Sequence, residues 1–109
     1  MKKIFIFLSV AVMSVAVNAG SQQGKVTSVL VRQSDGLHYF YISGTANGRP
    51  SCANGLSYWM IKDENSAAGR SQLSMLLTAY ASGKTVRVTG TGACTRWEDG
   101  EDLNTIQLK

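Results

Sequence analysis

The chain has 109 residues, with 11 basic and 7 acidic side chains, a formal net charge of +4, 44% hydrophobic residues and 17% charged residues. This length excludes most multidomain architectures, and the apolar content excludes an intrinsically disordered chain. Lys2 and Lys3 contribute half of the net charge, however, and all 11 glycines follow residue 19. The totals therefore combine two segments with different properties.

Residues 1–19 have the pattern of a secretory signal peptide. Lys2 and Lys3 precede an apolar segment over residues 4–17, and Val17-Asn18-Ala19 supplies small residues where a signal peptidase cleaves. The apolar segment of about 14 residues is shorter than the roughly 20 that span a bilayer, although a retained anchor is the alternative. We expect residues 20–109 to form one mature domain that is periplasmic or secreted and has no membrane span.

Cys52 and Cys94 are the two cysteines of the chain. An oxidising compartment favours a disulfide between them. Closing a loop of 43 residues, from Cys52 to Cys94 inclusive, would stabilise the fold by about 4 kcal/mol. The alternatives are a zinc site and a catalytic thiol, and His38 is the single histidine available to either. We favour the structural disulfide.

Hydrophobic and turn patterns predict five strands, separated by loops rich in glycine and polar residues. The expected strands cover residues 24–33, 38–43, 56–61, 84–89 and 103–108. Asp35-Gly36 lies between the first two apolar segments, a dipeptide typical of a β-hairpin turn. Residues 44–55 are rich in Gly, Asn and Ser and predict a loop.

An amphipathic helix is expected to begin at Ser66 or Arg70 and to end at Ser82. Its apolar side chains recur at spacings of three and four residues, namely Leu73, Leu76, Leu77 and Tyr80. Gly83 follows where a left-handed C-cap residue is common. The order strand, strand, strand, helix, strand, strand predicts a mostly β domain with one helix (α+β), of the OB-fold type, a five-stranded Greek-key barrel.

A set of residues from Gly24 to Val88 resembles, in order and spacing, the B subunit of subtilase cytotoxin and its relatives in typhoid-type toxins. The set comprises Tyr39-Phe40-x-Ile42, Ser51-Cys52, Trp59, Leu76, Ala79 and Gly83-x-x-Val86-Arg87-Val88. The resemblance implies an OB-fold, assembly into a pentameric ring and binding of sialylated glycans on host cells.

The resemblance does not extend to the sugar site of that family. Gln23 stands where the family has a serine that holds the sugar, and Gly90 stands where it has a contributing tyrosine. Tyr41 occupies the position of the family's second cysteine, so Cys94 lies elsewhere, and the long aromatic C-terminal extension is missing. The resemblance therefore implies the fold rather than the site.

We expect no enzymatic activity, no cofactor and no metal. The acidic segment Glu98-Asp99-Gly100-Glu101-Asp102 lacks the ligand spacing of an EF-hand, and we interpret it as a solvated surface loop. His38 is interpreted as an exposed or packing residue beside a turn. The serines lack a nucleophile-elbow sequence, and Gly90-x-Gly92 lacks the remaining parts of a dinucleotide fingerprint.

Aromatic side chains in the second and third predicted strands are candidate ligand contacts, because OB-folds commonly bind oligosaccharides or oligonucleotides there. These residues are Tyr39, Tyr41, Tyr58 and Trp59. Strand alternation places Phe40 and Ile42 on one face, which we expect to be the core, and leaves Tyr39 and Tyr41 on the other. Arg96 and Trp97 form a further candidate contact in the loop after Cys94.

A formal charge of +2 without Lys2 and Lys3, with scattered basic residues, argues against nucleic acid as a partner. Two hypotheses remain. The first is an exported carbohydrate-binding protein similar to a toxin B subunit, with a glycan or protein partner and a homo-oligomeric, pentameric state by resemblance. The second is an OB-fold interaction or structural protein of the periplasm or envelope that does not bind glycans.

Overall fold

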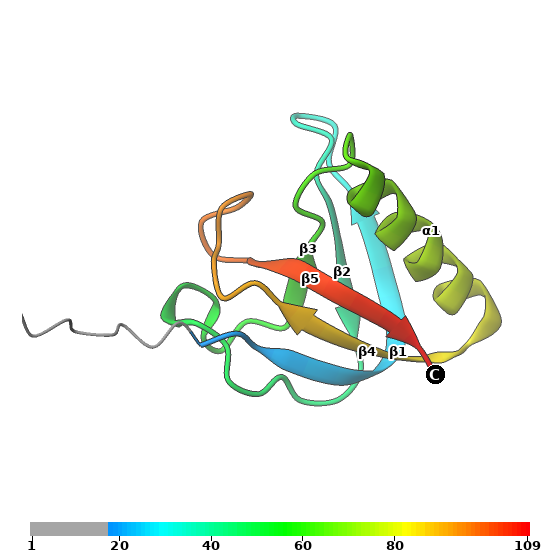
Figure 1. The fold of residues 1–109 in the computed structure, drawn as a ribbon, viewed down its shortest axis with the longest axis horizontal. Helices are drawn as coiled ribbons and strands as arrows, with labels where there is room; N and C mark the ends of the chain where they lie inside the picture. The colour runs from blue at the N-terminus through cyan, green and yellow to red at the C-terminus, as the bar shows by residue number, and fades with distance from the viewer. Residues whose placement is uncertain (1–17) are drawn as a thin grey trace, which may run out of the picture.

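The computed structural model describes residues 18–109, so most of the predicted signal peptide lies outside the described residues (Figure 1). Residues 18–109 form five strands, one α-helix and a short 3-10 turn. Their bounds are β1 Ser21–Val31, β2 His38–Ile42, the 3-10 turn Ser51–Ala53, β3 Tyr58–Met60, α1 Ala67–Ser82, β4 Thr85–Gly90 and β5 Glu101–Leu108. The predicted order of strands and helix is confirmed.

The strands close into a barrel in the order β1-β2-β3-β5-β4, and β4 pairs with β1. The 11-residue strand β1 pairs with β4 along its first half and with β2 along its second half. An irregularity between Val26 and Ser28 lies at this change of partner, where a bulge allows a strand to bend. β3 and β5 run parallel, and the other pairs are antiparallel. This is the five-stranded barrel with one helix between β3 and β4 that the OB-fold prediction required.

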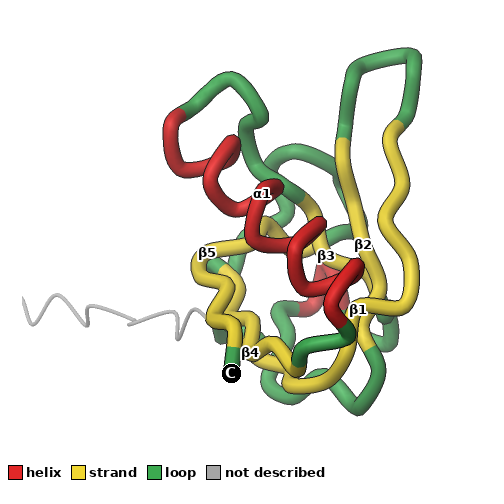
Figure 2. The backbone as a smooth tube through the Cα atoms, turned by 90° about the vertical axis from the view of Figure 1, so that its right-hand side faces the viewer, coloured by secondary structure: helices red, strands yellow, loops and turns green. Residues whose placement is uncertain are grey.

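The helix α1 packs along one side of the barrel, against β1 and β5 (Figures 1 and 2). Ser66 caps its N-terminus by accepting a hydrogen bond from the Gly69 amide at 2.9 Å, and Gly83 ends it with φ of 66°. The C-cap at Gly83 is as expected, and the start of the helix agrees with the Ser66 alternative. A Cβ on Gly69 would lie 1.7 Å from the Asp63 carbonyl oxygen, so the close approach of the preceding loop requires glycine.

The predicted apolar face of the helix is partly wrong. Leu76 and Ala79 are fully buried against the barrel, whereas Leu77 and Tyr80 are 48% and 53% exposed. The buried face includes Gly69, Leu76 and Ala79, and the small side chain of Ala79 lets the helix approach the strands closely. Leu77 and Tyr80 therefore face away from the core.

The barrel core confirms the predicted orientation of β2. Phe40 is fully buried and Ile42 is 6% exposed, while Tyr39 and Tyr41 lie on the outer face. Trp59 is also fully buried, which corrects its place among the candidate ligand contacts. It alternates with Tyr58 on β3 and therefore points inward, where its indole N–H donates to Gln22 Oε1 at 2.8 Å.

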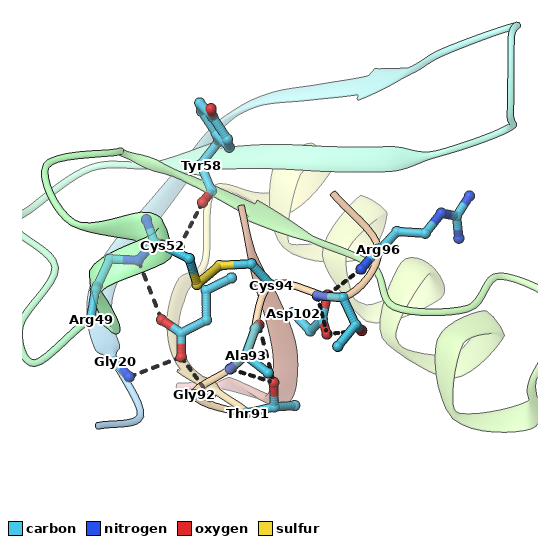
Figure 3. Close-up of a disulfide and its surroundings, with 12 residues drawn as sticks. Gly20, Arg49, Cys52, Tyr58, Thr91, Gly92, Ala93, Cys94, Arg96 and Asp102 are labelled. Carbon is cyan, nitrogen blue, oxygen red and sulfur yellow. Dashed lines mark hydrogen bonds and ion pairs between the residues drawn. A yellow bond between two sulfur atoms is a disulfide. The ribbon is translucent and has the colours of Figure 1, made fainter. Parts of the chain in front are cut away.

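The interpretation of the acidic segment as a solvated loop is wrong for its second half, because Glu101 and Asp102 are both fully buried while Glu98 is exposed. The Glu101 carboxylate accepts hydrogen bonds from the backbone amides of Gly20 and Gly92, each at 3.0 Å, and pairs with Arg49 Nε at 3.4 Å. Arg49 is itself buried and its guanidinium lies 4.0 Å above the Trp59 ring. Figure 3 shows this network beside the disulfide.

Cys52 and Cys94 form a disulfide, which confirms the predicted pair and replaces the zinc-site and thiol alternatives (Figure 3). The bond joins the 3-10 turn before β3 to the loop between β4 and β5. It indicates an oxidising compartment outside the cytoplasm. Within residues 18–109, no helix is long and apolar enough to cross a membrane.

Candidate functional site: an aromatic hollow on β2 and β3

Three tyrosines form a continuous cluster on the outer face of the β2–β3 pair. The strand register places Tyr41 opposite Tyr58, and alternation along β2 places Tyr39 on the same face. The ring centroids lie 6.5 Å (Tyr39–Tyr41), 6.2 Å (Tyr39–Tyr58) and 5.8 Å (Tyr41–Tyr58) apart. Tilted and edge-on contacts at these distances are favourable, so the rings support one another.

The tyrosines border a shallow hollow of about 190 Å³. We call it the aromatic hollow, and its lining residues are Arg32, Tyr39, Tyr41, Tyr58, Met60 and Trp97. Trp97 is 37% exposed, and the Arg32 guanidinium carbon lies 4.1 Å from its ring centroid. Strand alternation from Tyr58 could have identified Met60. Nothing local in the sequence could have identified Arg32, which follows β1 and reaches the hollow through the fold.

The buried Asp102 carboxylate fixes the loop that carries Trp97. It accepts hydrogen bonds from the backbone amides of Thr95 at 3.2 Å and Arg96 at 3.1 Å, and from the Thr95 hydroxyl. Gly100 donates to the Trp97 carbonyl at 3.3 Å, which closes a tight turn. Asp102 is therefore a positioning residue for this wall of the hollow.

Arg96, a predicted ligand contact, does not line the hollow. Its guanidinium donates to the Glu64 carboxylate and to the backbone carbonyls of Lys62 and Asp35. Glu64 also accepts from the His38 amide at 2.7 Å and lies 3.2 Å from His38 Nδ1. Burial raises the pKa of Glu64, but the hydrogen bonds from Arg96 and His38 outweigh it and lower that pKa below its usual value. Arg96 thus connects three loops.

The two arginines near the aromatic hollow are paired with carboxylates of the protein. Arg32 donates to the Asp35 carboxylate through Nε at 3.0 Å and Nη2 at 2.6 Å, and these bonds lower the pKa of Asp35 to about 2. Both arginines at this surface, Arg32 and Arg96, therefore pair with carboxylates. The hollow offers aromatic faces and phenol hydroxyls rather than an unpaired positive charge among its described lining residues.

The surroundings of Tyr58 alter the titration of its phenol. Burial, and then the neighbouring Asp99 carboxylate, raise the pKa of Tyr58 to about 12. Asp99 Oδ1 is buried and accepts no hydrogen bond from the described residues. Tyr58 consequently stays a neutral hydroxyl over the whole physiological pH range.

An absorbance titration tests this electrostatic arrangement. We expect a phenol component with a midpoint near pH 12 that is absent from Tyr58→Phe. Asp99→Asn should move that midpoint toward the ordinary value of about 10, although only in part because burial is the larger cause. The folded protein favours the neutral phenol, so this stabilisation is present below pH 10 and is lost as pH rises toward 12. An unchanged midpoint in Asp99→Asn would contradict the assignment of Asp99.

No protein-family model, no curated protein and no solved structure matches this chain. Residues 18–109 also hold no group of three or more His, Cys, Asp or Glu side chains arranged to bind a metal ion. The fold and the geometry of the aromatic hollow are therefore the basis for the functional argument.

Proposed function

We propose that the protein is an exported binding protein without catalytic activity, and that the aromatic hollow binds carbohydrate. The observation that carries this proposal is the contiguous Tyr39, Tyr41 and Tyr58 cluster on the β2–β3 face. OB-folds commonly present ligands to this face. An aromatic ring offers an apolar face to the C–H groups of a sugar, while a tyrosine hydroxyl can exchange hydrogen bonds with the sugar hydroxyls.

The charge arrangement favours a neutral sugar over an acidic one. A carboxylate-bearing sugar is best held by an unpaired guanidinium or ammonium group. Arg32 is already bonded twice to Asp35, and Arg96 is bonded to Glu64. This proposal differs from what the resemblance to toxin B subunits implies, because those bind sialylated glycans. We therefore keep the likeness in fold and propose neutral sugars as the ligand class and the aromatic hollow as the binding surface.

The second hypothesis is an interaction protein without glycan affinity. The observation in its favour is an exposed apolar surface between β1 and α1, where Val31, Leu77 and Tyr80 are 64%, 48% and 53% exposed. Exposed apolar groups that line one groove are typical of a protein contact.

Sedimentation of the processed chain tests the pentameric ring that the resemblance to toxin B subunits implies. A monomer would contradict that ring.

A glycan array on the processed chain, followed by titration with the best ligand, tests carbohydrate binding. We expect neutral glycans to bind, and Tyr39→Ala and Tyr41→Ala each to weaken binding about tenfold, since a stacked ring contributes roughly 1–3 kcal/mol. Tyr80→Ala is the matched control, because Tyr80 is exposed on α1 outside the aromatic hollow. Absence of binding to every glycan would support the second hypothesis instead. An equal loss in Tyr80→Ala would contradict the assignment of glycan binding to the aromatic hollow.

A further inference from the structure

The backbone nitrogen of Gly20 lies 3.0 Å from Glu101 Oε2, although the two residues are 81 positions apart (Figure 3). Gly20 is buried, and the Glu101 side chain is fully buried. Gly20 is also the first residue after the expected cleavage position, Val17-Asn18-Ala19. The residue that processing would expose as a new N-terminus is therefore already in contact with a buried carboxylate.

The position of Gly20 is fixed by contacts on its C-terminal side. The Gly20 carbonyl accepts from the Gly90 amide at 2.8 Å, and Ser21 exchanges two backbone hydrogen bonds with Asn47, at 2.9 and 2.8 Å. Asn18 and Ala19 are exposed. Removal of the preceding residues therefore leaves the contacts that hold Gly20 in place.

The site also selects glycine. A Cβ at position 20 would lie 2.6 Å from Glu101 Oε1 and 2.8 Å from Arg49 Cγ, so any side chain would displace the carboxylate or the arginine stem. The Cα of residue 20 therefore has no room for a side chain beside Glu101 and Arg49.

We infer that cleavage between Ala19 and Gly20 creates an α-ammonium group that forms an ion pair with Glu101, a contact that the precursor cannot make. Hydrolysis adds water across the peptide bond, so that Ala19 leaves as a carboxylate. The Gly20 amine takes up a proton, because an α-amino group has a pKa of about 7.7–8.0. The inference depends on the expected cleavage position and is independent of carbohydrate binding.

The two carboxylate oxygens of Glu101 have different partners, which leaves one of them for the ammonium group. Glu101 Oε1 faces Arg49 Nε at 3.4 Å, whereas Glu101 Oε2 accepts two neutral amide bonds, from Gly20 and Gly92. Processing makes one of these two donors positively charged. The bond from Gly20 already has a charged acceptor, and a positive charge on its donor adds Coulomb attraction across the 3.0 Å between the two atoms. The folded state of the processed chain is therefore more stable than that of the precursor.

The test compares a chain that begins at Gly20 with a free amine and the same chain with an acetylated amine. Acetylation keeps the N–H donor and removes the positive charge. Near pH 6 we expect acetylation to raise the unfolding equilibrium constant roughly fivefold to tenfold, as measured by urea unfolding. Glu101→Gln is the matched variant, because it keeps the shape and removes the negative charge. In that variant the free and acetylated forms should be equally stable.

A pH series provides a second measurement that needs no substitution. The two forms share every other titrating group, Glu101 and Arg49 included, so the difference between them reports the amine alone. The stabilisation by the ammonium should be present below about pH 8 and disappear as pH rises toward 10, where the amine is neutral. A stability that acetylation leaves unchanged, or a difference that persists at pH 10 or in Glu101→Gln, would overturn the inference. Such a result would leave the proposal of carbohydrate binding standing, because the two proposals concern different sites.

Discussion

Replacing Glu101 by alanine is expected to lower the free energy of unfolding by about 3–5 kcal/mol, the cost of breaking a buried ion pair by removing one partner. The substitution leaves the Arg49 side chain, which is 3% exposed, without its carboxylate. It also removes the acceptor of the Gly20 and Gly92 amides. Because whole domains are stable by only about 5–15 kcal/mol, a loss of this size is a large fraction of the total.

Glu98→Ala is the matched control for this prediction. Glu98 belongs to the same acidic segment, but it is exposed, so its replacement should change stability by less than about 0.5 kcal/mol. Urea unfolding of both variants at pH 7 measures the difference, with similar denaturant slopes if the folded and unfolded states keep their surface areas. Equal, small effects of the two substitutions would show that Glu101 does not act as a buried anchor.

The acidic segment shows why local sequence could not predict this network. Four acidic residues around a glycine are typical of a surface loop, and nothing within the segment distinguishes Glu98 from Glu101. The partners of Glu101 are distant in sequence, with Arg49 52 positions away and Gly20 81 positions away. Its burial follows from closure of the barrel, which brings the start of β5 beside the start of β1 and the end of β4. Only the complete fold determines it.

Features that depend on neighbouring residues were predictable. Two-residue alternation placed Phe40 in the core and Tyr39 and Tyr41 outside, and the structure confirms this because a strand has no other way to arrange adjacent side chains. The C-terminal cap at Gly83 was predictable for a similar reason, since a left-handed residue with φ of 66° favours glycine. These rules need no knowledge of which element lies opposite.

Features that depend on the packing partner were predicted only in part. Trp59 was grouped with the tyrosines because its type suits a binding surface, but Gln22, 37 positions away, accepts its indole N–H inside the barrel. On α1, two overlapping apolar stripes share Leu76, and helical periodicity alone cannot decide between them. Ala79 marks the stripe that approaches the strands, because a small side chain permits close contact, while Gly69 on the same stripe packs against the loop at Asp63.

The aromatic hollow contains residues whose placement follows from neighbouring positions and residues whose placement depends on the packing partner. Its tyrosines follow from alternation and register, whereas Trp97 and Arg32 reach it from loops. The loop that carries Trp97 is held by two separate restraints, the Asp102 carboxylate and the disulfide at Cys94. The wall of the hollow is therefore more rigid than a free surface loop, which would reduce the entropy lost on ligand binding.

Removing the disulfide by a double substitution, Cys52→Ala with Cys94→Ala, is expected to lower the free energy of unfolding by about 4 kcal/mol. The two cysteines are 42 positions apart, and the bond mainly restricts the unfolded chain. The double variant should consequently show a lower urea midpoint and a steeper slope, because its unfolded state exposes more surface. The native contacts of Glu101 and Asp102 do not involve either sulfur atom, so the folded state should persist.

A reducing agent provides the control for this second prediction. It should shift the midpoint of the unsubstituted chain to that of the double variant and leave the double variant unchanged. Adding Glu101→Ala to the double variant then separates the two restraints. Since the bond acts on the unfolded state and the ion pair on the folded state, their effects should add to within about 0.5 kcal/mol. A larger coupling would mean that the disulfide also holds the Arg49 loop against Glu101. If reduction left the urea midpoint of the unsubstituted chain unchanged, the predicted stabilisation by the disulfide would be contradicted.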